Sequence, residues 1–175
     1  MENECEKEVI IIVDKDDNVI AYKKRGDLDS KKDIYRVTGL WLTNSKKEIL
    51  FVQRSFNLKH NPGKWGPAVS GTVTKGETYE DNIYKEAEEE IGIKGLRFKL
   101  GPKYSTLKRP NVKYLHFTQW FLAEIDKEID DFELQKEEVE QIKWFSEEEV
   151  LKIFKENPDF FSSGIFYWIK LFINK

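Results

Sequence analysis

Three glutamates in the middle of the chain, Glu86, Glu89 and Glu90, have the spacing of one helical face. At about 100° per residue, Glu90 lies about 40° from Glu86 on one side and Glu89 about 60° from it on the other. Carboxylates at this spacing repel one another, and the repulsion grows where water is excluded. A divalent cation that prefers oxygen ligands would offset it. The spacing therefore indicates a metal site, although a solvated acidic helix face has the same local pattern.

The segment around these glutamates has the signals of a helix. No Gly or Pro occurs from Thr78 to Ile91, and Gly92 follows where a left-handed C-cap is favoured. Ile83, Ala87 and Ile91 form an apolar stripe next to the glutamates. We therefore expect a helix over about residues 78–91 that holds the carboxylates at the edge of its buried face.

Residues 71–93 resemble the Nudix box, a pattern written G-x5-E-x7-R-E-U-x-E-E-x-G-U, where U is an aliphatic residue. The matching positions are Gly71, Glu77, Lys85, Glu86, Ala87, Glu89, Glu90, Gly92 and Ile93. Lys85 stands where the pattern has Arg. It keeps the charge that can pair with Glu77 but lacks the forked guanidinium, so we expect these two residues to give weaker structural support between loop and helix.

The resemblance implies an α/β fold, a Nudix-type α/β/α sandwich with a mixed central sheet, in one Nudix hydrolase domain over residues 1–175. It implies Mg²⁺ or Mn²⁺ held by Glu86, Glu89, Glu90 and the backbone carbonyl near Gly71. The implied reaction is hydrolysis of a phosphoanhydride bond in a nucleoside diphosphate-linked substrate. The sequence does not name the group attached to the diphosphate.

The residue that takes a proton from water varies within this family, so several carboxylates are candidates. Glu86 and Glu89 are two of them. Residues 137–144 resemble the strand that precedes the last helix of the family, which adds Glu138 and Glu140. For each of these two, a place on a surface loop is an equally good interpretation.

Residues 11–20, 49–55 and 61–65 resemble the isopentenyl-diphosphate-isomerase-like branch of the superfamily. In that branch Arg54 would lie near the diphosphate and Trp65 would shape the floor of the pocket, whereas a surface Arg and a core Trp are the plain alternatives. Further loop cations that could contact phosphate are Lys59, Lys64, Lys108 and Arg109. Among these, Lys64 directly precedes Trp65, and we group it with Arg54 and Trp65 as substrate-binding.

Two other functions fit the same resemblance less well. Isomerases of this branch carry a Cys in the strand before the box, where this chain has Ser70, and its single Cys is Cys5. A catalytically silent, nucleotide-sensing Nudix domain would usually have lost box glutamates, and all of them are present here. Hydrolysis is therefore the favoured interpretation.

Composition limits the partners and the compartment. The 175 residues are 39% hydrophobic, and the net charge of −3 argues against binding of duplex nucleic acid. The single Cys excludes an internal disulfide and fits a reducing compartment. With no signal peptide and no apolar run of about 20 residues, we expect a cytoplasmic protein without a membrane segment that acts on a small molecule. If part of its aromatic C-terminal face is left uncovered within the monomer, we expect that surface to form a homodimer contact.

The remaining pattern predicts the elements that must position the box. Strands are expected at residues 8–13, 19–25, 35–44, 48–55, 68–70, 96–106, 113–125 and 140–145, with a loop at 61–67. The strands at 35–44 and 48–55 are expected to pair around a tight turn. Ser146, followed by Glu149, predicts a capped helix, and residues 162–175 predict an amphipathic terminal helix. His116, within a long apolar strand, is expected to be a core residue.

Overall fold

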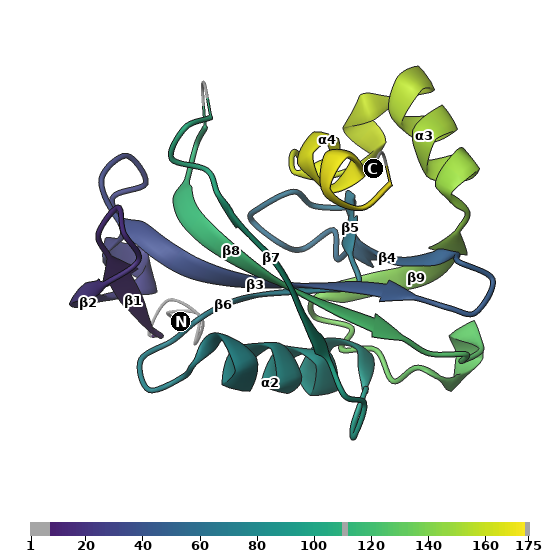
Figure 1. Ribbon diagram of the computed structural model, residues 1–175, viewed down its shortest axis with the longest axis horizontal. Helices are drawn as coiled ribbons and strands as arrows, with labels where there is room; N and C mark the ends of the chain where they lie inside the picture. The colour runs from purple at the N-terminus through teal and green to yellow at the C-terminus, as the bar shows by residue number, and fades with distance from the viewer. Residues whose placement is uncertain (1–7, 110–111, 174–175) are drawn as a thin grey trace.

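The computed structural model describes residues 8–109 and 112–173, in which nine strands form one mixed sheet (Figure 1). Strands β1 to β9 span Val9–Val13, Val19–Lys24, Ile34–Thr43, Ile49–Arg54, Trp65–Pro67, Val69–Thr72, Lys99–Ser105, Leu115–Glu124 and Val139–Phe145. The α-helices α2, α3 and α4 span Tyr79–Ile91, Glu147–Glu156 and Ile165–Trp168, and a π-helix, Ile169–Ile173, continues α4. Short 3₁₀ turns η1, η2 and η3 span Arg25–Asp27, Ile129–Asp131 and Pro158–Phe160.

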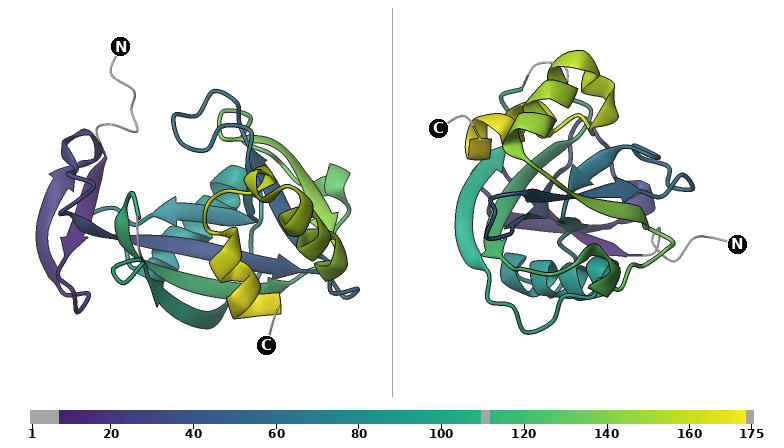
Figure 2. Two further views of the ribbon diagram at one scale, coloured as in Figure 1. Left: turned by 90° about the horizontal axis from the view of Figure 1, so that it is seen from above. Right: turned by 90° about the vertical axis from the view of Figure 1, so that its right-hand side faces the viewer.

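Helix α2 covers one face of the sheet, and α3 and α4 cover the other (Figures 1 and 2). The strand period of two residues produces this arrangement. Leu40, Leu42 and Leu50 are buried in the cluster under α2, while Trp41 and Phe51, between or beside them, are buried in the cluster under α3 and α4. Strands buried on both faces read as continuous apolar runs. The expected α/β fold with helices on both sides of a mixed sheet is confirmed.

Strand β3 is the centre of the sheet. It pairs in parallel with β8 over ten residue pairs and in antiparallel register with β6 along Val37–Leu40. The expected pairing of residues 35–44 with 48–55 is therefore wrong except at the turn, where Thr43 pairs with Ile49. Strand β6 occupies the edge of β3 that β4 would have used. Strand β4 pairs instead with β9 and β5.

The loop expected at residues 61–67 is also partly wrong, because Trp65–Pro67 forms the short strand β5. It pairs with β4, with Phe51 opposite Pro67. Burial of the Trp65 side chain holds this segment against the sheet. Proline cannot donate a backbone hydrogen bond, and Pro67 is tolerated because β5 ends the strand order and is an edge strand.

The β1–β2 hairpin is fastened to the rest of the sheet through its turn. Asp17, in the left-handed region with φ of 66°, accepts a hydrogen bond of 2.8 Å from Nε of Arg36 in β3. The hydroxyl of Tyr79, at the start of α2, lies 3.2 Å from the same carboxylate, and Lys103 of β7 forms an ion pair with it. One acidic side chain thus joins the hairpin to β3, α2 and β7.

The aromatic C-terminal segment packs into the core. Phe172 stacks on Trp41 with ring centroids 4.4 Å apart, and Trp168 meets Trp120 edge to face. The helix expected over 162–175 is present from Ile165 to Ile173, and its last two residues lie outside the described part of the chain. No helix within the described residues is long and apolar enough to cross a membrane.

Candidate functional site

Helix α2 presents the box glutamates, and it ends at Gly92 as the sequence predicts, while its start is fixed by a capping box that the sequence analysis did not identify. The Thr78 side chain accepts from the backbone N–H of Asp81 at 3.1 Å, and the Asp81 carboxylate accepts from the N–H of Thr78 at 2.9 Å. This capping box starts the helix. Gly92 ends it with φ of 67°. Between the caps the apolar stripe is fully buried, so the helix has one fixed rotation about its axis.

The three glutamates differ in burial. Glu90 is buried, Glu86 is half-buried, and Glu89 is exposed. Burial raises the pKa of Glu86 to about 7, against the lowering effect of Lys85. Burial also raises the pKa of Glu90 well above its usual value, and the charges of Glu86 and Glu138 add to that effect. Two of the three carboxylates are therefore desolvated, unlike those of a plain acidic surface.

Glu86 lies directly against Gly71. A Cβ atom on residue 71 would stand 2.4 Å from Cγ, 2.5 Å from Cδ and 2.7 Å from Oε1 of Glu86. All three distances are shorter than van der Waals contact, so only glycine leaves the Glu86 carboxylate this position. Gly71 is held in β6 opposite Thr38 of β3, whose hydroxyl lies 3.5 Å from the Gly71 carbonyl oxygen.

Glu77 connects the loop before α2 to the helix. Its carboxylate lies 3.0 Å from Nζ of Lys85 and accepts 2.9 Å and 3.0 Å hydrogen bonds from the Thr74 backbone N–H and the Asn82 amide. Burial would raise the pKa of Glu77, but these partners outweigh burial and hold the pKa below its usual value. Lys85 thus occupies the position facing Glu77 that the sequence predicts.

Sequence reasoning missed Asn82, which is fully buried and hydrogen-bonds to Oε1 of Glu86 at 3.1 Å. The signal was available, because Asn82 precedes Glu86 by four residues and side chains at that spacing are neighbours on a helix.

Two residues from other parts of the chain, Glu138 and Arg54, act on the box carboxylates through their charges. The backbone N–H of Ser55 donates to the carbonyl of Glu138 at 2.8 Å, which sets the loop before β9 beside the end of β4. Glu138 is half-buried, and its charge raises the pKa of both Glu86 and Glu90. Arg54 lowers the pKa of Glu90. Glu140, in contrast, is exposed and lines a pocket beside η2. Of the two later candidates, Glu138 is the one whose charge acts on Glu86 and Glu90.

Other predicted substrate-binding residues lie on the α3–α4 side. Trp65 is buried and stacks on Phe160 with centroids 5.6 Å apart, so it has the packing role of a core Trp. Lys64 forms an ion pair of 3.4 Å with Asp159. Their contact with a substrate stays a prediction.

The two histidines do not join the box carboxylates. Burial lowers the pKa of His116 to about 4, and its Nδ1 lies 3.1 Å from the Thr118 hydroxyl, which fits the expected core role. The ring of His60, in the loop after β4, lies 3.2 Å from the hydroxyl of Tyr114, and its backbone carbonyl accepts from Arg54.

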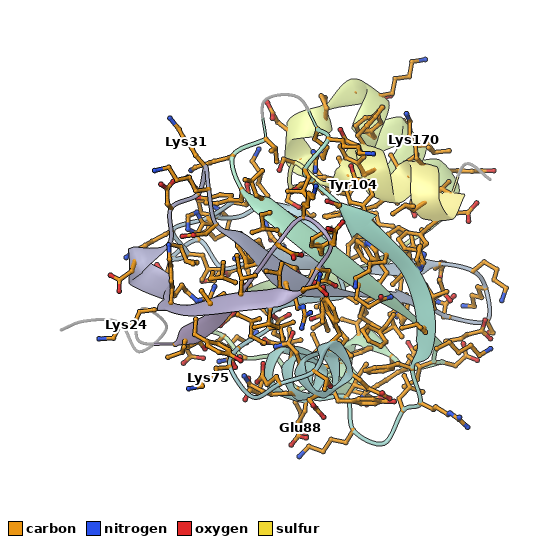
Figure 3. The ribbon with its side chains drawn as sticks, turned by 60° about the vertical axis from the view of Figure 1, so that its left-hand side comes forward. Lys24, Lys31, Lys75, Glu88, Tyr104 and Lys170 are labelled. Carbon is orange, nitrogen blue, oxygen red and sulfur yellow. The ribbon has the colours of Figure 1, made fainter. Side chains whose placement is uncertain are left out.

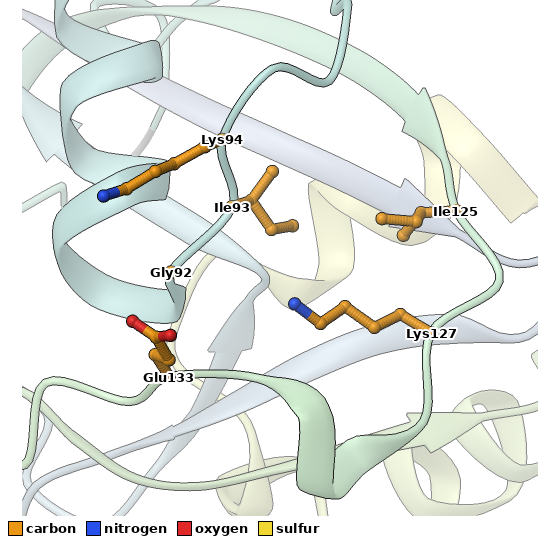
Figure 4. A pocket seen from close by; sticks show the side chains of 6 residues that line it. All are labelled: Gly92, Ile93, Lys94, Ile125, Lys127 and Glu133. Atoms are coloured by element: carbon orange, nitrogen blue, oxygen red, sulfur yellow. The ribbon is translucent and has the colours of Figure 1, made fainter.

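A pocket at the C-terminal end of α2 is separate from this group of residues (Figure 4). Its lining consists of Gly92, Ile93, Lys94, Ile125, Lys127 and Glu133. None of the residues predicted to bind metal or substrate lines it. We therefore locate the candidate site at the Gly71–Glu86 contact and not in this pocket.

The donor chemistry of the site suits a divalent cation, although no three His, Cys, Asp or Glu side chains in residues 8–109 and 112–173 converge as a ready-made metal site. Carboxylates without a counter-ion repel, so bringing the oxygens of the other glutamates to Glu86 requires those side chains to rotate as the cation binds. Glu86, Glu90 and Glu138 are within electrostatic range of one another, and Glu86 borders the Gly71 backbone. Oxygen donors of this kind are the ligands that Mg²⁺ and Mn²⁺ prefer.

Comparison with known proteins agrees with this geometry. A family model described as NUDIX domain matches residues 34–163. An uncharacterised Nudix hydrolase of Yersinia pestis is 30% identical over 144 residues, covering 82% of this chain and 75% of the relative. Isopentenyl-diphosphate Delta-isomerase 2 of Photorhabdus laumondii is 24% identical over 168 residues, covering 95% and 91%.

The fold has a counterpart among solved structures. A crystal structure of a Deinococcus radiodurans protein superimposes with a TM-score of 0.81 at 20% identity, covering 94% of this chain and 99% of that one. This likeness shows the fold alone. The family model spans most of the chain and includes the whole loop–helix segment described above, and on that ground the chain belongs to the Nudix family.

Proposed function

We propose that the chain hydrolyses a phosphoanhydride bond in a nucleoside diphosphate-linked small molecule, using Mg²⁺ or Mn²⁺. The ligands would be Glu86, Glu89, Glu90 and the carbonyl of Gly71. The observation that supports this most is the desolvation of Glu86 and Glu90 beside Glu138. Burying carboxylates next to one another costs free energy, and a bound cation would offset that cost.

A bound cation would neutralise part of the charge on the diphosphate and lower the pKa of a coordinated water. The protein's own part is positional. Glu86 is confined between Gly71 and the Asn82 amide, so its carboxylate is held in place before substrate binds. Arg54, close enough to act on Glu90, supplies positive charge for the diphosphate oxygens.

The proton acceptor is one of Glu86, Glu89 and Glu138. Glu138 suits this role best, because it lies on a loop outside the helix and its charge acts on both Glu86 and Glu90. A group that accepts a proton must reach the reacting water, and a half-buried loop side chain has the freedom to do so.

The experiment is hydrolysis of nucleoside di- and triphosphates, sugar nucleotides and dinucleoside polyphosphates with Mg²⁺ or Mn²⁺. We expect Glu90→Gln to lower kcat by at least ~10², the scale for losing a charged transition-state stabiliser. The matched control is Glu88→Gln, in the same acidic run but exposed and pointing away from the sheet (Figure 3). Full activity in excess chelator would contradict metal dependence.

Thermal unfolding gives a second readout that does not need the substrate. At a hundredfold excess over Kd, Mg²⁺ should stabilise the wild type by about 2.7 kcal/mol. Glu90→Gln should gain much less from the cation, and Glu88→Gln as much as the wild type. An equal gain in stability in all three proteins would mean that the glutamates form a solvated acidic surface and not a metal site.

The likeness to an isopentenyl-diphosphate isomerase favours one alternative, interconversion of isopentenyl and dimethylallyl diphosphate. Ser70 stands in the strand where isomerases of the branch carry a Cys, so we expect no isomer exchange by NMR. Cys5, outside the described residues, should be replaceable by Ser without loss of hydrolysis. Observed exchange would establish the isomerase instead, and nucleotide binding without turnover would indicate a sensing domain.

A further inference from the structure

Asn82 is a buried polar residue at a position that the box pattern leaves open. Its side chain has no solvent exposure. Its amide nitrogen lies 3.1 Å from Oε1 of Glu86, 3.0 Å from Oε2 of Glu77 and 3.2 Å from the carbonyl oxygen of Thr72. Its amide oxygen accepts from the Thr38 hydroxyl at 2.6 Å. One side chain therefore connects the central strand, the box strand, the loop and the box helix.

The four contacts determine the orientation of the amide. The three neighbours on one side of Asn82, from Glu86, Glu77 and Thr72, are all oxygens at hydrogen-bond distance. Rotating the amide by 180° would place its oxygen against them and its NH₂ group against the Thr38 hydroxyl. A carbonyl facing three acceptors has no hydrogen to share, and a buried polar group left in that state costs free energy. The three acceptor oxygens thus select the orientation that directs the NH₂ group at Glu86. The Thr38 hydroxyl, which can donate or accept, donates to the amide oxygen and holds the amide in that place.

Glu86 is consequently held from two sides. The bare Cα of Gly71 provides the space for its carboxylate, and the Asn82 amide binds one of its oxygens. The same amide binds Glu77, which also pairs with Lys85. Displacement of the loop at Glu77 is therefore transmitted to Glu86 through a single side chain.

We propose that Asn82 is a positioning residue that orients Glu86 for metal binding, and that Thr38 holds Asn82 in position. The inference rests on the proposed function, since it assigns Glu86 to the metal. It goes beyond that function by placing part of the metal affinity in a strand residue that contacts no carboxylate. Partners behind a ligand commonly contribute about 10–100-fold in metal affinity.

A purely structural role is the competing interpretation. In that case Asn82 would only satisfy the buried carbonyl of Thr72, and replacing it would lower stability without a specific effect on metal. Thr38→Val helps to separate the two, because it removes the hydroxyl, keeps the shape of the side chain and leaves Glu86, Glu77 and Asn82 in the chain. It also removes the 3.5 Å contact of this hydroxyl with the Gly71 carbonyl, so Asn82→Ala, which leaves that hydroxyl in place, must show the same loss of metal affinity. Thr118→Val is the matched control, a buried β-strand threonine whose hydroxyl contacts His116.

The experiment measures Mn²⁺ affinity of wild type, Asn82→Ala, Thr38→Val, Thr38→Ser and Thr118→Val from the electron paramagnetic resonance of free Mn²⁺. Thermal unfolding in chelator is recorded in parallel. We expect Thr38→Val and Asn82→Ala to weaken Mn²⁺ binding about 10-fold or more. Thr38→Ser, which restores the hydroxyl, should restore the affinity, and Thr118→Val should change stability alone. In turnover, kcat should fall at a given Mn²⁺ concentration and recover as Mn²⁺ is raised, with the substrate KM nearly constant.

Two results would overturn the proposal in different ways. If the wild type binds Mn²⁺ and Thr38→Val binds it as tightly as Thr118→Val does, the positioning role is wrong and the proposed function stands. If the wild type does not bind Mn²⁺ at all, the proposed function fails, and the inference fails with it.

Discussion

At the scale of single residues, Gly71 and Glu86 share a space that any side chain on residue 71 would fill. We predict that Gly71→Ala displaces the Glu86 carboxylate, because the new Cβ would meet it at 2.4–2.7 Å. A displacement near 1 Å at a catalytic group can cost about 10²-fold in rate. Gly66→Ala is the matched control, since a Cβ there would meet only the Ser162 hydroxyl at 3.9 Å. Steady-state kcat/KM of the two variants tests the prediction, and equal losses would contradict it.

The raised pKa of Glu86, about 7, makes a second residue-scale prediction. A carboxyl with a higher pKa in the folded than in the unfolded state stabilises the fold below its unfolded pKa, and that contribution is lost as pH rises through the folded value. Metal-free wild type should therefore lose stability relative to Glu86→Gln between about pH 5 and 8. The expected relative loss is on the order of 2–3 kcal/mol.

Denaturant unfolding in chelator at several pH values measures this difference, and comparison with the variant cancels the other titrating groups. Adding Mg²⁺ at pH 8 should recover part of the loss, because the cation favours the ionised carboxylates. Parallel curves for the two proteins across this pH range would show that Glu86 is not desolvated.

Helical spacing predicts which glutamates share one side of the helix, but not how deeply each is buried. Glu86, Glu89 and Glu90 look alike in the sequence, and the structure leaves only Glu89 exposed. The difference depends on β6 and on the loop before β9, which the helical pattern does not contain. Asn82 was missed although its spacing to Glu86 places the two side by side on the helix, because that spacing does not show that Thr38 of β3 faces it from the sheet.

At the scale of elements, helix α2 carries two ion pairs that allow a direct comparison. Lys85 and Glu77 have side chains 38% and 18% exposed, whereas Lys94 and Glu88 are 69% and 54% exposed. Exposed pairs contribute little. We predict that Lys85→Ala destabilises the protein by about 1 kcal/mol and Lys94→Ala by under about 0.5 kcal/mol. Urea unfolding at low salt measures both. Equal effects would mean that the Glu77–Lys85 pair does not support the loop.

Elements defined by local signals were predicted well, and elements defined by distant partners were not. The predicted capping box of α3 and the predicted Gly92 cap of α2 are encoded within a few residues, and both are present. The short strand at Trp65–Pro67 exists only because β4 lies beside it. Likewise, a tight turn favours a hairpin of β3 with β4, but β6, from further along the chain, takes that edge of β3.

At the scale of the whole molecule, the Asp17 contacts hold the β1–β2 hairpin against the domain. Asp17 is 12% exposed and its partner Arg36 is 19% exposed. Removing one partner of a buried pair leaves the other charge uncompensated, which costs up to about 3–5 kcal/mol. We predict that Asp17→Asn destabilises the protein by about 2–3 kcal/mol, while keeping a residue that tolerates the left-handed turn.

Asp16→Asn is the control for this prediction, because Asp16 belongs to the same turn and is exposed. Thermal unfolding of the two variants, compared at one pH and salt concentration, gives the difference. If Asp17→Asn unfolds at the temperature of Asp16→Asn, the hairpin is held by its strand pairing and not by this carboxylate.

The parallel pairing of β3 with β8 has a consequence for how the protein comes to be active. The chain between these two strands contains β4 to β7 and the whole of α2. Contacts this far apart in sequence form slowly, because a long loop must close before they gain any free energy. Before the sheet forms, helix α2 has its glutamates but not the contacts with Thr38 of β3 and Gly71 of β6. Glu138 of the proposed site follows β8 in the chain. A growing polypeptide would therefore lack part of that site until β8 and the loop after it had been made.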